Sequence, residues 1–263
     1  MFRILFALML MPTVIQTVIA DDTTEIDLQP LIDASRDDFR VFVEQDLSAP
    51  LPPMTVMRWA NNARGSANGA TLVWTHQGRP EVVCCIYPWM GRLEHAFGSL
   101  SRGKVRVMKD GKIVWAPKES GVTFSEVPGA PAVAKSANLR KRQLTQLARQ
   151  FSGTMTGWKK DNSDREELRL LNTPLYRYEP ADSQLLDGAL FAFAQGTDPE
   201  ILLLLEAWSP DGQPARWHYA FVRRTSGGLA AHHKGVLVWE AEKHPDQHQP
   251  LSIHMTIPGA AIR

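Results

Sequence analysis

The segment VMRWANNARGSANGATLVWTHQGRPEVVCCIYPW (residues 56–89) returns later in the chain as LYRYEPADSQLLDGALFAFAQGTDPEILLLLEAW (residues 175–208). The two copies align without a gap, and identical residues stand at matching positions in both. After a short insertion in the later copy, SPDGQPA, the alignment continues between residues 92–115 and 216–239. Similarity that keeps one register over this length indicates an internal duplication of one structural unit.

The residues kept in both copies include charged, small and aromatic types. The clearest pairs are Arg58/Arg177, Gly69/Gly188, Pro80/Pro199, Glu81/Glu200, Trp89/Trp208, Arg92/Arg216 and Trp115/Trp239. Between these positions, most differences within the apolar runs exchange one apolar residue for another. The pattern therefore predicts two modules with the same strands.

Each copy is predicted to consist of antiparallel β-strands. TLVWT (71–75) is a short apolar run, whereas EVVCCIY (81–87) and EILLLLEAW (200–208) are continuous apolar runs. A continuous apolar run is typical of a strand that is covered on both faces. Lys-Asp-Gly and His-Lys-Gly turns precede KIVWA and VLVWE, and glycine supplies the positive φ that tight hairpins need. We expect a β-meander of four or five strands in each copy.

A helix is predicted in SANLRKRQLTQLARQF (136–151), between the two copies. Ser136 is placed to cap the N-terminus of this helix. Four apolar residues share one helical face, namely Leu144, Leu147, Ala148 and Phe151. A weaker match at residues 28–46 predicts a short helix that leads into a strand before the first copy.

The expected fold class is α+β and mainly antiparallel β, with two pseudo-equivalent β-meander modules and at least one packed helix. We expect the modules to share a core, because a meander of this size buries too little surface alone. The predicted divisions are a signal peptide (1–20), an N-terminal helix and strand segment (21–50), β module 1 (51–117), a Pro/Ala-rich linker (118–135), a helix plus β module 2 (136–241) and a C-terminal tail (242–263).

The first residues predict export. Arg3 precedes a mostly apolar stretch at 4–20, and the small residues Val18 and Ala20 suit the −3 and −1 positions of a signal peptidase site. An uncleaved N-terminal anchor is the alternative, but the run is short and broken by Pro12. No later run reaches the roughly 20 apolar residues of a membrane helix. We expect a secreted or periplasmic protein with no membrane span after signal cleavage.

Composition narrows the function classes. A net charge of +1 gives no field that favours nucleic acid, and 44% hydrophobic with 22% charged residues is ordinary for a globular chain. The two cysteines cannot form a disulfide framework. Cys84 and Cys85 align with Leu203 and Leu204 of the second copy. Because neighbours on a strand face opposite ways, we interpret them as apolar filler of a strand buried on both faces.

The paired polar residues allow two interpretations. In the structural one, Arg58 contacts Glu81 and Arg177 contacts Glu200, so that each module has a pair pinning its strand ends. In the other, Glu81 and Glu200 form the two carboxylates of a hydrolase, which glycosidases hold about 5–10 Å apart. Both glutamates follow a turn proline at a strand start, which favours the structural role. No catalytic residue is predicted.

The histidines give weak support for a metal site. His244 and His248 have the i, i+4 spacing of a helical site, but the prolines around them leave barely one helical turn. His232 and His233 are adjacent on a predicted strand and therefore point to opposite sides. Nucleophile-elbow and nucleotide-binding motifs are absent from the sequence. We predict no metal ligand and no cofactor, with a site built on the spaced pair or on distant residues as the open alternative.

Two of the eight tryptophans are candidates for ligand contact. Trp89 and Trp208 each end a strand before a loop, where an exposed ring can stack on a sugar or meet a partner. Trp115 and Trp239 end apolar strands and are expected in the core. The predicted function is an exported non-catalytic protein that binds a glycan, a cell-envelope component or a protein partner. The alternative is a secreted hydrolase that uses carboxylates or a His-based metal site.

Three strings, RGSANGATLVWTHQGRPEVVCCIYPW (64–89), LRLLNTPLYRYEP (168–180) and LDGALFAFAQGTDPEILLLLEA (186–207), resemble an uncharacterised family of exported proteins. Members of this family occur in many copies in planctomycete bacteria and are carried as hypothetical proteins. The resemblance covers about residues 53–239. It implies export and a single structural unit. Because the family has no assigned activity, it implies no catalytic residue, cofactor or ligand.

Overall fold

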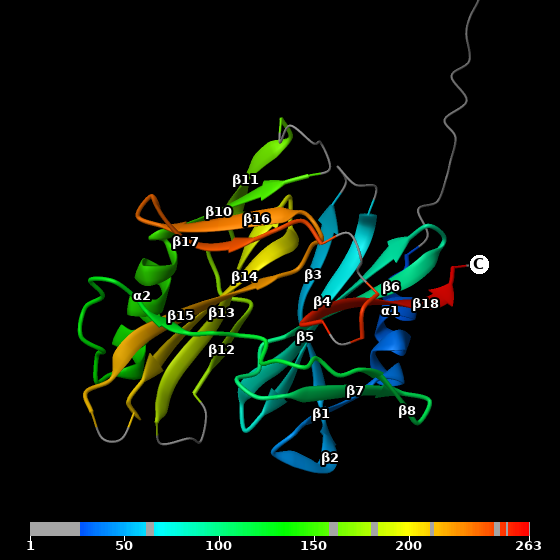
Figure 1. Cartoon of the computed structure of the whole chain (residues 1–263), viewed down its shortest axis with the longest axis horizontal. Helices are drawn as coiled ribbons and strands as arrows, with labels where there is room; N and C mark the ends of the chain where they lie inside the picture. Colours follow the sequence, from blue (N-terminus) through cyan, green and yellow to red (C-terminus); the bar gives the residue numbers. More distant parts are fainter. Residues whose placement is uncertain are drawn as a thin grey trace, which may run out of the picture.

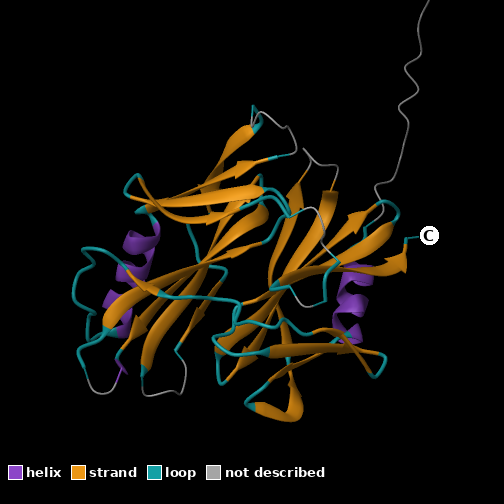
Figure 2. Cartoon of the chain, viewed as in Figure 1, coloured by secondary structure: helices purple, strands orange, loops and turns teal. Residues whose placement is uncertain are grey.

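The computed structural model describes residues 27–61, 66–157, 163–179, 184–210, 213–244, 248–250 and 252–262. The signal peptide expected at 1–20 lies outside this part. The described chain is mostly antiparallel β-structure with two short α-helices, which agrees with the α+β class (Figure 2). Neither of these helices has the length and apolar character needed to cross a membrane.

The first half of the chain contains a helix, a 3-10 turn and eight strands. Their bounds are α1 (Gln29–Ser35), η1 (Arg36–Asp38), β1 (Arg40–Val43), β2 (Asp46–Leu51), β3 (Pro53–Asn61), β4 (Ser66–His76), β5 (Arg79–Trp89), β6 (Arg92–Ser99), β7 (Val105–Lys109) and β8 (Lys112–Trp115). The helix and strand expected within residues 28–46 are therefore confirmed as α1 and β1.

Two sheets are built from these strands. Strands β3 to β6 form the expected meander, and the C-terminal strand β18 (His254–Ala261) adds to its β6 edge. The sequence pattern predicts the KIVWA strand in this meander, and that prediction is wrong: the strand, β8, lies in a second sheet in the order β2-β1-β7-β8. In this second sheet, β7 and β8 cover the outer face of the meander. Their residues Val107 and Trp115 pack on Trp74 and Phe97 of that face.

The second half also contains a helix followed by eight strands in its described part. Their bounds are α2 (Ala137–Ala148), β10 (Phe151–Thr156), β11 (Arg165–Leu170), β12 (Tyr176–Tyr178), β13 (Leu185–Gln195), β14 (Asp198–Trp208), β15 (Arg216–Arg223), β16 (Gly228–His233) and β17 (Val236–Ala241). Strands β12 to β15 form a meander, and β11, β10, β16 and β17 are neighbours in the same order as β2, β1, β7 and β8. Here the two sets join into one sheet, because β11 also pairs with β13.

The pairing registers of the two halves also agree. Val107 lies opposite Trp115 in the β7–β8 hairpin, and Ala231 lies opposite Trp239 in β16–β17. In both hairpins the register shifts directly after this pair. The long hairpins β4–β5 and β13–β14 likewise shift register at aligned positions. The similarity therefore extends from the strand order to the irregularities in the ladders.

Helix α2 packs on β13 and β14, as α1 packs on β4. Leu144, Leu147 and Ala148 are buried, as the helical periodicity predicts. Two details of the prediction are wrong. Phe151 begins β10 instead of ending the helix, and Ser136, although at the N-cap position, makes no capping hydrogen bond with its side chain.

The core has three layers of apolar contacts. A central layer holds the two meanders face to face, with Val73 and Val83 of the first packed against Leu190, Leu202 and Leu204 of the second. An outer layer in each half joins the other face of the meander to the helix and the smaller strands. Figure 1 shows the halves side by side. The expected shared core between the modules is confirmed.

Two segments cross from one half to the other. The strand β9 (Ser125–Glu126) follows β8 of the first half, in the Pro/Ala-rich stretch, but pairs with β15 of the second. Strand β18 follows β17 of the second half but pairs with β6 of the first. Its residues Met255 and Ile257 are buried in the first half's core. The C-terminal tail is thus a strand that completes the sheet of the opposite half.

The vicinal cysteines lie on the central strand β5 of the first meander. Cys84 packs in the outer core of that half, whereas Cys85 packs on the opposite face with Trp59 and Ala96. Burial raises the pKa of both thiols. The interpretation of this pair as apolar filler of a doubly covered strand is confirmed by their full burial as free thiols.

Candidate functional site

The arginines kept in both copies anchor each meander to the helix of its own half. The guanidinium of Arg58 forms an ion pair with Asp33 of α1, with 2.8 Å between Nη2 and Oδ1. Arg177 binds the buried carboxylate of Asp187, with 2.6 Å between Nη2 and Oδ2. Arg140 of α2 reaches the same oxygen at 2.8 Å. In each half, ion pairs therefore link the first strand of the meander with the helix.

The structure corrects the expected Arg58–Glu81 and Arg177–Glu200 pairs. Each arginine lies on the first strand of its meander, and each glutamate lies at the start of the third. Across β4, Arg58 is in register with Ile86, which is near the other end of β5 from Glu81. The second half has the same register. Two polar residues that are each kept in both copies thus need not contact one another.

A buried charge cluster instead joins the two halves, and its members are Arg79, Glu81, Arg102, Tyr178 and Glu206. Oε1 of Glu206 lies 2.9 Å from Nε of Arg79 and accepts a hydrogen bond from the Tyr178 hydroxyl at 2.8 Å. Oε2 of Glu206 lies 2.6 Å from Nη2 of Arg102. Nη1 of Arg79 donates to Glu81 at 3.0 Å.

The pKa values of two members of the cluster, Arg79 and Tyr178, are shifted by their surroundings. Burial lowers the pKa of Arg79, but the attraction of Glu206 and Glu81 outweighs burial and leaves this pKa raised. Burial, followed by the charge of Glu206, raises the pKa of Tyr178 well above its ordinary value. Neither group exchanges a proton near neutral pH. The cluster is an ion network that holds the two meanders together, because a partner withdrawn from it leaves a buried charge unpaired.

Trp208 belongs to the edge of this cluster. The guanidinium of Arg102 lies over its ring, 4.4 Å from the ring centroid, and over Phe124 at 4.1 Å. Arg102 is thus held between two aromatic rings while it binds Glu206. The half-buried indole of Trp208 is occupied by a contact inside the protein.

Trp89, its counterpart in the first half, faces the solvent. It ends β5 at the tip of the β5–β6 hairpin, and half of its surface (50%) is exposed. The next residue, Met90, is 86% exposed. Met90 and Gly91 both have positive φ, of 48° and 75°, as a two-residue hairpin turn with the right-handed strand twist requires. The aligned tryptophans therefore have different surroundings.

The buried histidines are held in neutral form. Nε2 of His95 lies 3.2 Å from Oγ of Ser35, and burial, followed by the charge of Lys109, lowers the pKa of His95 to about 4. Burial, followed by the charge of Arg224, lowers the pKa of His254 well below its ordinary value. Among the residues that the structure describes, no group of three or more His, Cys, Asp or Glu side chains is placed to hold a metal ion.

His244 and His248, the pair with helical spacing, form hydrogen bonds in the segment that leads to β18. The backbone N–H of His244 donates to the carbonyl oxygen of Ser226. Nδ1 of His248 lies 2.8 Å from the carbonyl oxygen of Thr256 on β18. Residues 245–247 between them lie outside the described part of the chain.

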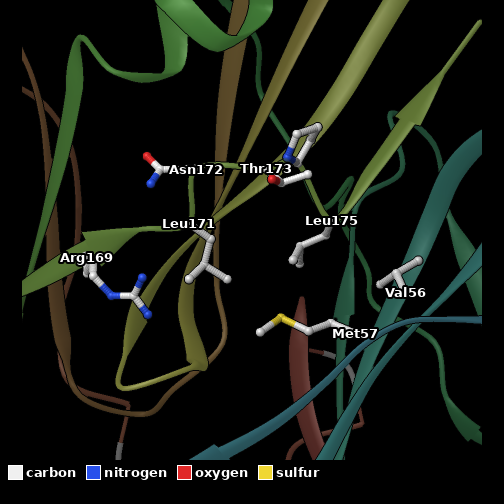
Figure 3. Close-up of a pocket in the computed structure, with 8 residues that line it drawn as sticks. Val56, Met57, Arg169, Leu171, Asn172, Thr173 and Leu175 are labelled. Carbon is white, nitrogen blue, oxygen red and sulfur yellow. The ribbon is translucent and has the colours of Figure 1, made fainter.

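An open hollow of about 420 Å³ lies between the halves beside β3 (Figure 3). Val56 and Met57 of β3 form one wall, and Leu171 and Leu175, from the segment after β11, form the other. The side chains of Met57, Leu171 and Leu175 point toward one another across the opening, with Arg169 at its edge. Val56 and Leu175 occupy aligned positions of the two copies, and the hollow lies between β3 and the segment that leads into β12.

No family model, curated protein or solved structure matches this chain.

Of the residues that join the halves, sequence reasoning selected only Glu81, because it considered polar residues kept in both copies. Arg79 aligns with Asp198, and Glu206 aligns with Tyr87. A different signal was present: Glu206 is a charged residue inside the continuous apolar run EILLLLEAW, and a carboxylate in such a strand must be paired. The exposure of Met90 had no comparable signal in the pattern of the strands.

Proposed function

We propose that this protein is an exported, non-catalytic binding protein, secreted or periplasmic, with Trp89 in its contact surface. The observation that carries the proposal is the half-exposed indole of Trp89 at a hairpin tip, where the aligned Trp208 is covered by Arg102. An exposed tryptophan is a typical anchor of a binding surface, because its large ring combines apolar area with an N–H donor. The partner classes are a glycan, a cell-envelope component or a protein.

The charged residues of the fold support binding over hydrolysis. The two carboxylates expected for a hydrolase, Glu81 and Glu200, are both buried, and Arg79 binds Glu81 inside the molecule. A catalytic carboxylate must reach its substrate and change its protonation state. The geometry of this ion network favours a structural role for these carboxylates, so we do not propose the secreted hydrolase.

Binding of the mature chain to isolated envelope fractions tests the proposal, with separate glycan, lipid and protein fractions. We expect Trp89→Ala to weaken binding to one fraction by about tenfold or more, as the loss of an anchor residue does. Leu237→Ala is the matched control, because Leu237 is 51% exposed on β17 of the other half. If both variants bind every fraction as the native protein does, Trp89 has no part in binding and the proposal fails.

We also infer that the two halves arose by duplication of one unit with a helix and eight strands. The inference is supported by the same strand order, by ladder irregularities at aligned positions and by the reciprocal crossing of β9 and β18. Reciprocal exchange of a terminal strand is a common way in which identical subunits form a dimer. We infer that such a dimer preceded the fused chain.

A further inference from the structure

Four hairpins in the described chain share one kind of two-residue turn, in which a non-glycine residue with positive φ precedes a glycine. The turns are Gln77–Gly78, Met90–Gly91, Asp110–Gly111 and Lys234–Gly235. Left-handed backbone is unfavourable for a residue with a side chain, and hairpin tips favour polar residues that water solvates. Three of the four turns follow this rule.

Met90 is the exception, because it is an apolar residue at the positive-φ position of its turn. It places an apolar side chain, 86% exposed, at a strained tip, next to the half-exposed Trp89. The corresponding connection in the second half is SPDGQPA (209–215), which is longer and contains no large apolar residue. Exposed apolar surface is unfavourable in water, and neither side chain recovers this cost inside the protein. The tip is therefore built for a contact outside the molecule.

The segment beside this hairpin tip, residues 255–262, contains no charged residue. The backbone N–H of Ile262 donates to the carbonyl oxygen of Gly91 at 2.8 Å, and Ala261 lies opposite Arg92. Figure 1 places this end of β18 beside the hairpin. Between residues 87 and 93, the one charged residue is Arg92, which is exposed. The tip thus combines apolar side chains, a tryptophan and a positive charge.

We propose that Trp89 and Met90 insert into the surface of an anionic membrane, with Arg92 on the lipid headgroups. This inference rests on the proposed binding function and names a lipid surface as the envelope component. An indole prefers the boundary between headgroups and acyl chains, because one end of the ring is apolar and the other donates a hydrogen bond. The unbranched methionine enters the acyl region without requiring a pocket of fixed shape. A guanidinium beside them attracts anionic headgroups.

Co-sedimentation with vesicles tests this inference. The mature chain is incubated with phosphatidylcholine vesicles, with and without phosphatidylglycerol, at low and at physiological ionic strength. We expect binding to the anionic vesicles, which weakens as salt screens Arg92. Met90→Asn is the decisive variant, because asparagine is favoured at a positive φ and keeps the turn. It should fold at least as well as the native protein and bind the vesicles about tenfold more weakly.

Further variants separate the contributions at the tip. Trp89→Ala should weaken binding to both kinds of vesicle, and Arg92→Gln should remove the preference for phosphatidylglycerol. Lys234→Gln, at the same position of another turn, should bind as the native protein does. Equal vesicle binding by native protein and Met90→Asn overturns the inference, as does native protein that binds no vesicle.

The outcome also separates this inference from the proposed function. If the native protein binds no vesicle but Trp89→Ala loses binding to a glycan or protein fraction, the lipid inference fails and the proposed function stands. If Trp89→Ala changes no binding at all, both fail. Capture of a protein partner through the same tip counts against the lipid surface.

Discussion

Glu206 accepts contacts from Arg79, Arg102 and Tyr178, and its side chain has no exposed surface. A carboxylate in this position is stable because each of its oxygens meets a positive charge. The aligned residue in the other half is Tyr87, which packs with Trp59 and Cys85 of its own half. Burial raises the pKa of Tyr87 and keeps its hydroxyl neutral. At these two aligned positions the halves therefore place an ion-paired carboxylate and a neutral hydroxyl.

His95 gives a prediction about pH. Its pKa in the folded protein is about 4, whereas the ordinary value is 6.5. As pH falls below 6.5, the unfolded chain binds a proton that the folded protein refuses, so the free energy of unfolding decreases until about pH 4. We expect this site to remove up to about 1.4 kcal/mol per pH unit in that window.

Urea denaturation at about pH 5.5 and about pH 7.5 measures this effect, above the range in which ordinary carboxyl groups titrate. His95→Gln should show a smaller loss of stability between the two values than the native protein does. Some loss should remain, because the pKa of His254 is lowered as well. An unchanged loss in His95→Gln contradicts the role assigned to this side chain.

At the scale of the element, β18 shows how a terminal segment becomes structural. Its residues Met255 and Ile257 fill the core between the first meander and its helix, while Ile253, just before the strand, is 39% exposed. The strand covers the β6 edge, whose backbone groups otherwise lack a partner strand. An element from the second half is therefore part of the stability of the first.

Paired substitutions test this role of β18. Ile257→Ala should lower the free energy of unfolding by about 2–4 kcal/mol, because it leaves a cavity in the core. Ile253→Ala is the control from the same segment and should change stability by no more than about 0.5 kcal/mol. Chemical denaturation of both variants measures the difference. Similar small effects of the two changes would show that β18 is not packed as described.

The sequence predicts the elements better than their partners. The period of Leu144, Leu147 and Ala148 locates α2, and the continuous apolar runs locate β5 and β14. The departure of β7–β8 from the meander was not predictable, because strand periodicity specifies a face and not a neighbouring strand. Strand β18 was missed because Pro258 and Gly259 are typical breakers, which an edge strand tolerates.

For the candidate site, too, the sequence predicts the position of a residue but not the residues that contact it. The strand-end position of Trp89 made it a candidate, and its exposure agrees with that choice. Trp208 has the same position in the sequence, but Arg102, which lies far from it in the chain, covers its ring. Such a contact depends on how the two halves pack. Sequence patterns within one half carry no information about it.

At the scale of the whole molecule, each half contributes a strand to the sheet of the other. Strand β9 closes the β15 edge, and β18 closes the β6 edge. The charge cluster around Glu206 and the central apolar layer add to these links. The molecule thus resembles a dimer whose subunits are joined by a covalent connection.

A divided chain tests this description. Residues 21–131 and 132–263, produced as two polypeptides, should associate into a one-to-one complex, because the cut falls between β9 and α2. Each fragment alone should be unstable or should aggregate, since it lacks an edge strand and exposes the apolar face of its meander. Size-exclusion chromatography with light scattering measures the complex. Two fragments that fold separately as stable monomers would contradict the exchange of strands.

The position of β18 has a consequence for the order in which the protein can fold. It is translated after all the other described strands, yet its neighbour is β6 of the first half. The β6 edge of the first sheet therefore stays uncovered while the second half is still being made. Met255 and Ile257 likewise reach the core of the first half only after the rest of the described strands have been made, so the hydrophobic core of that half is completed last.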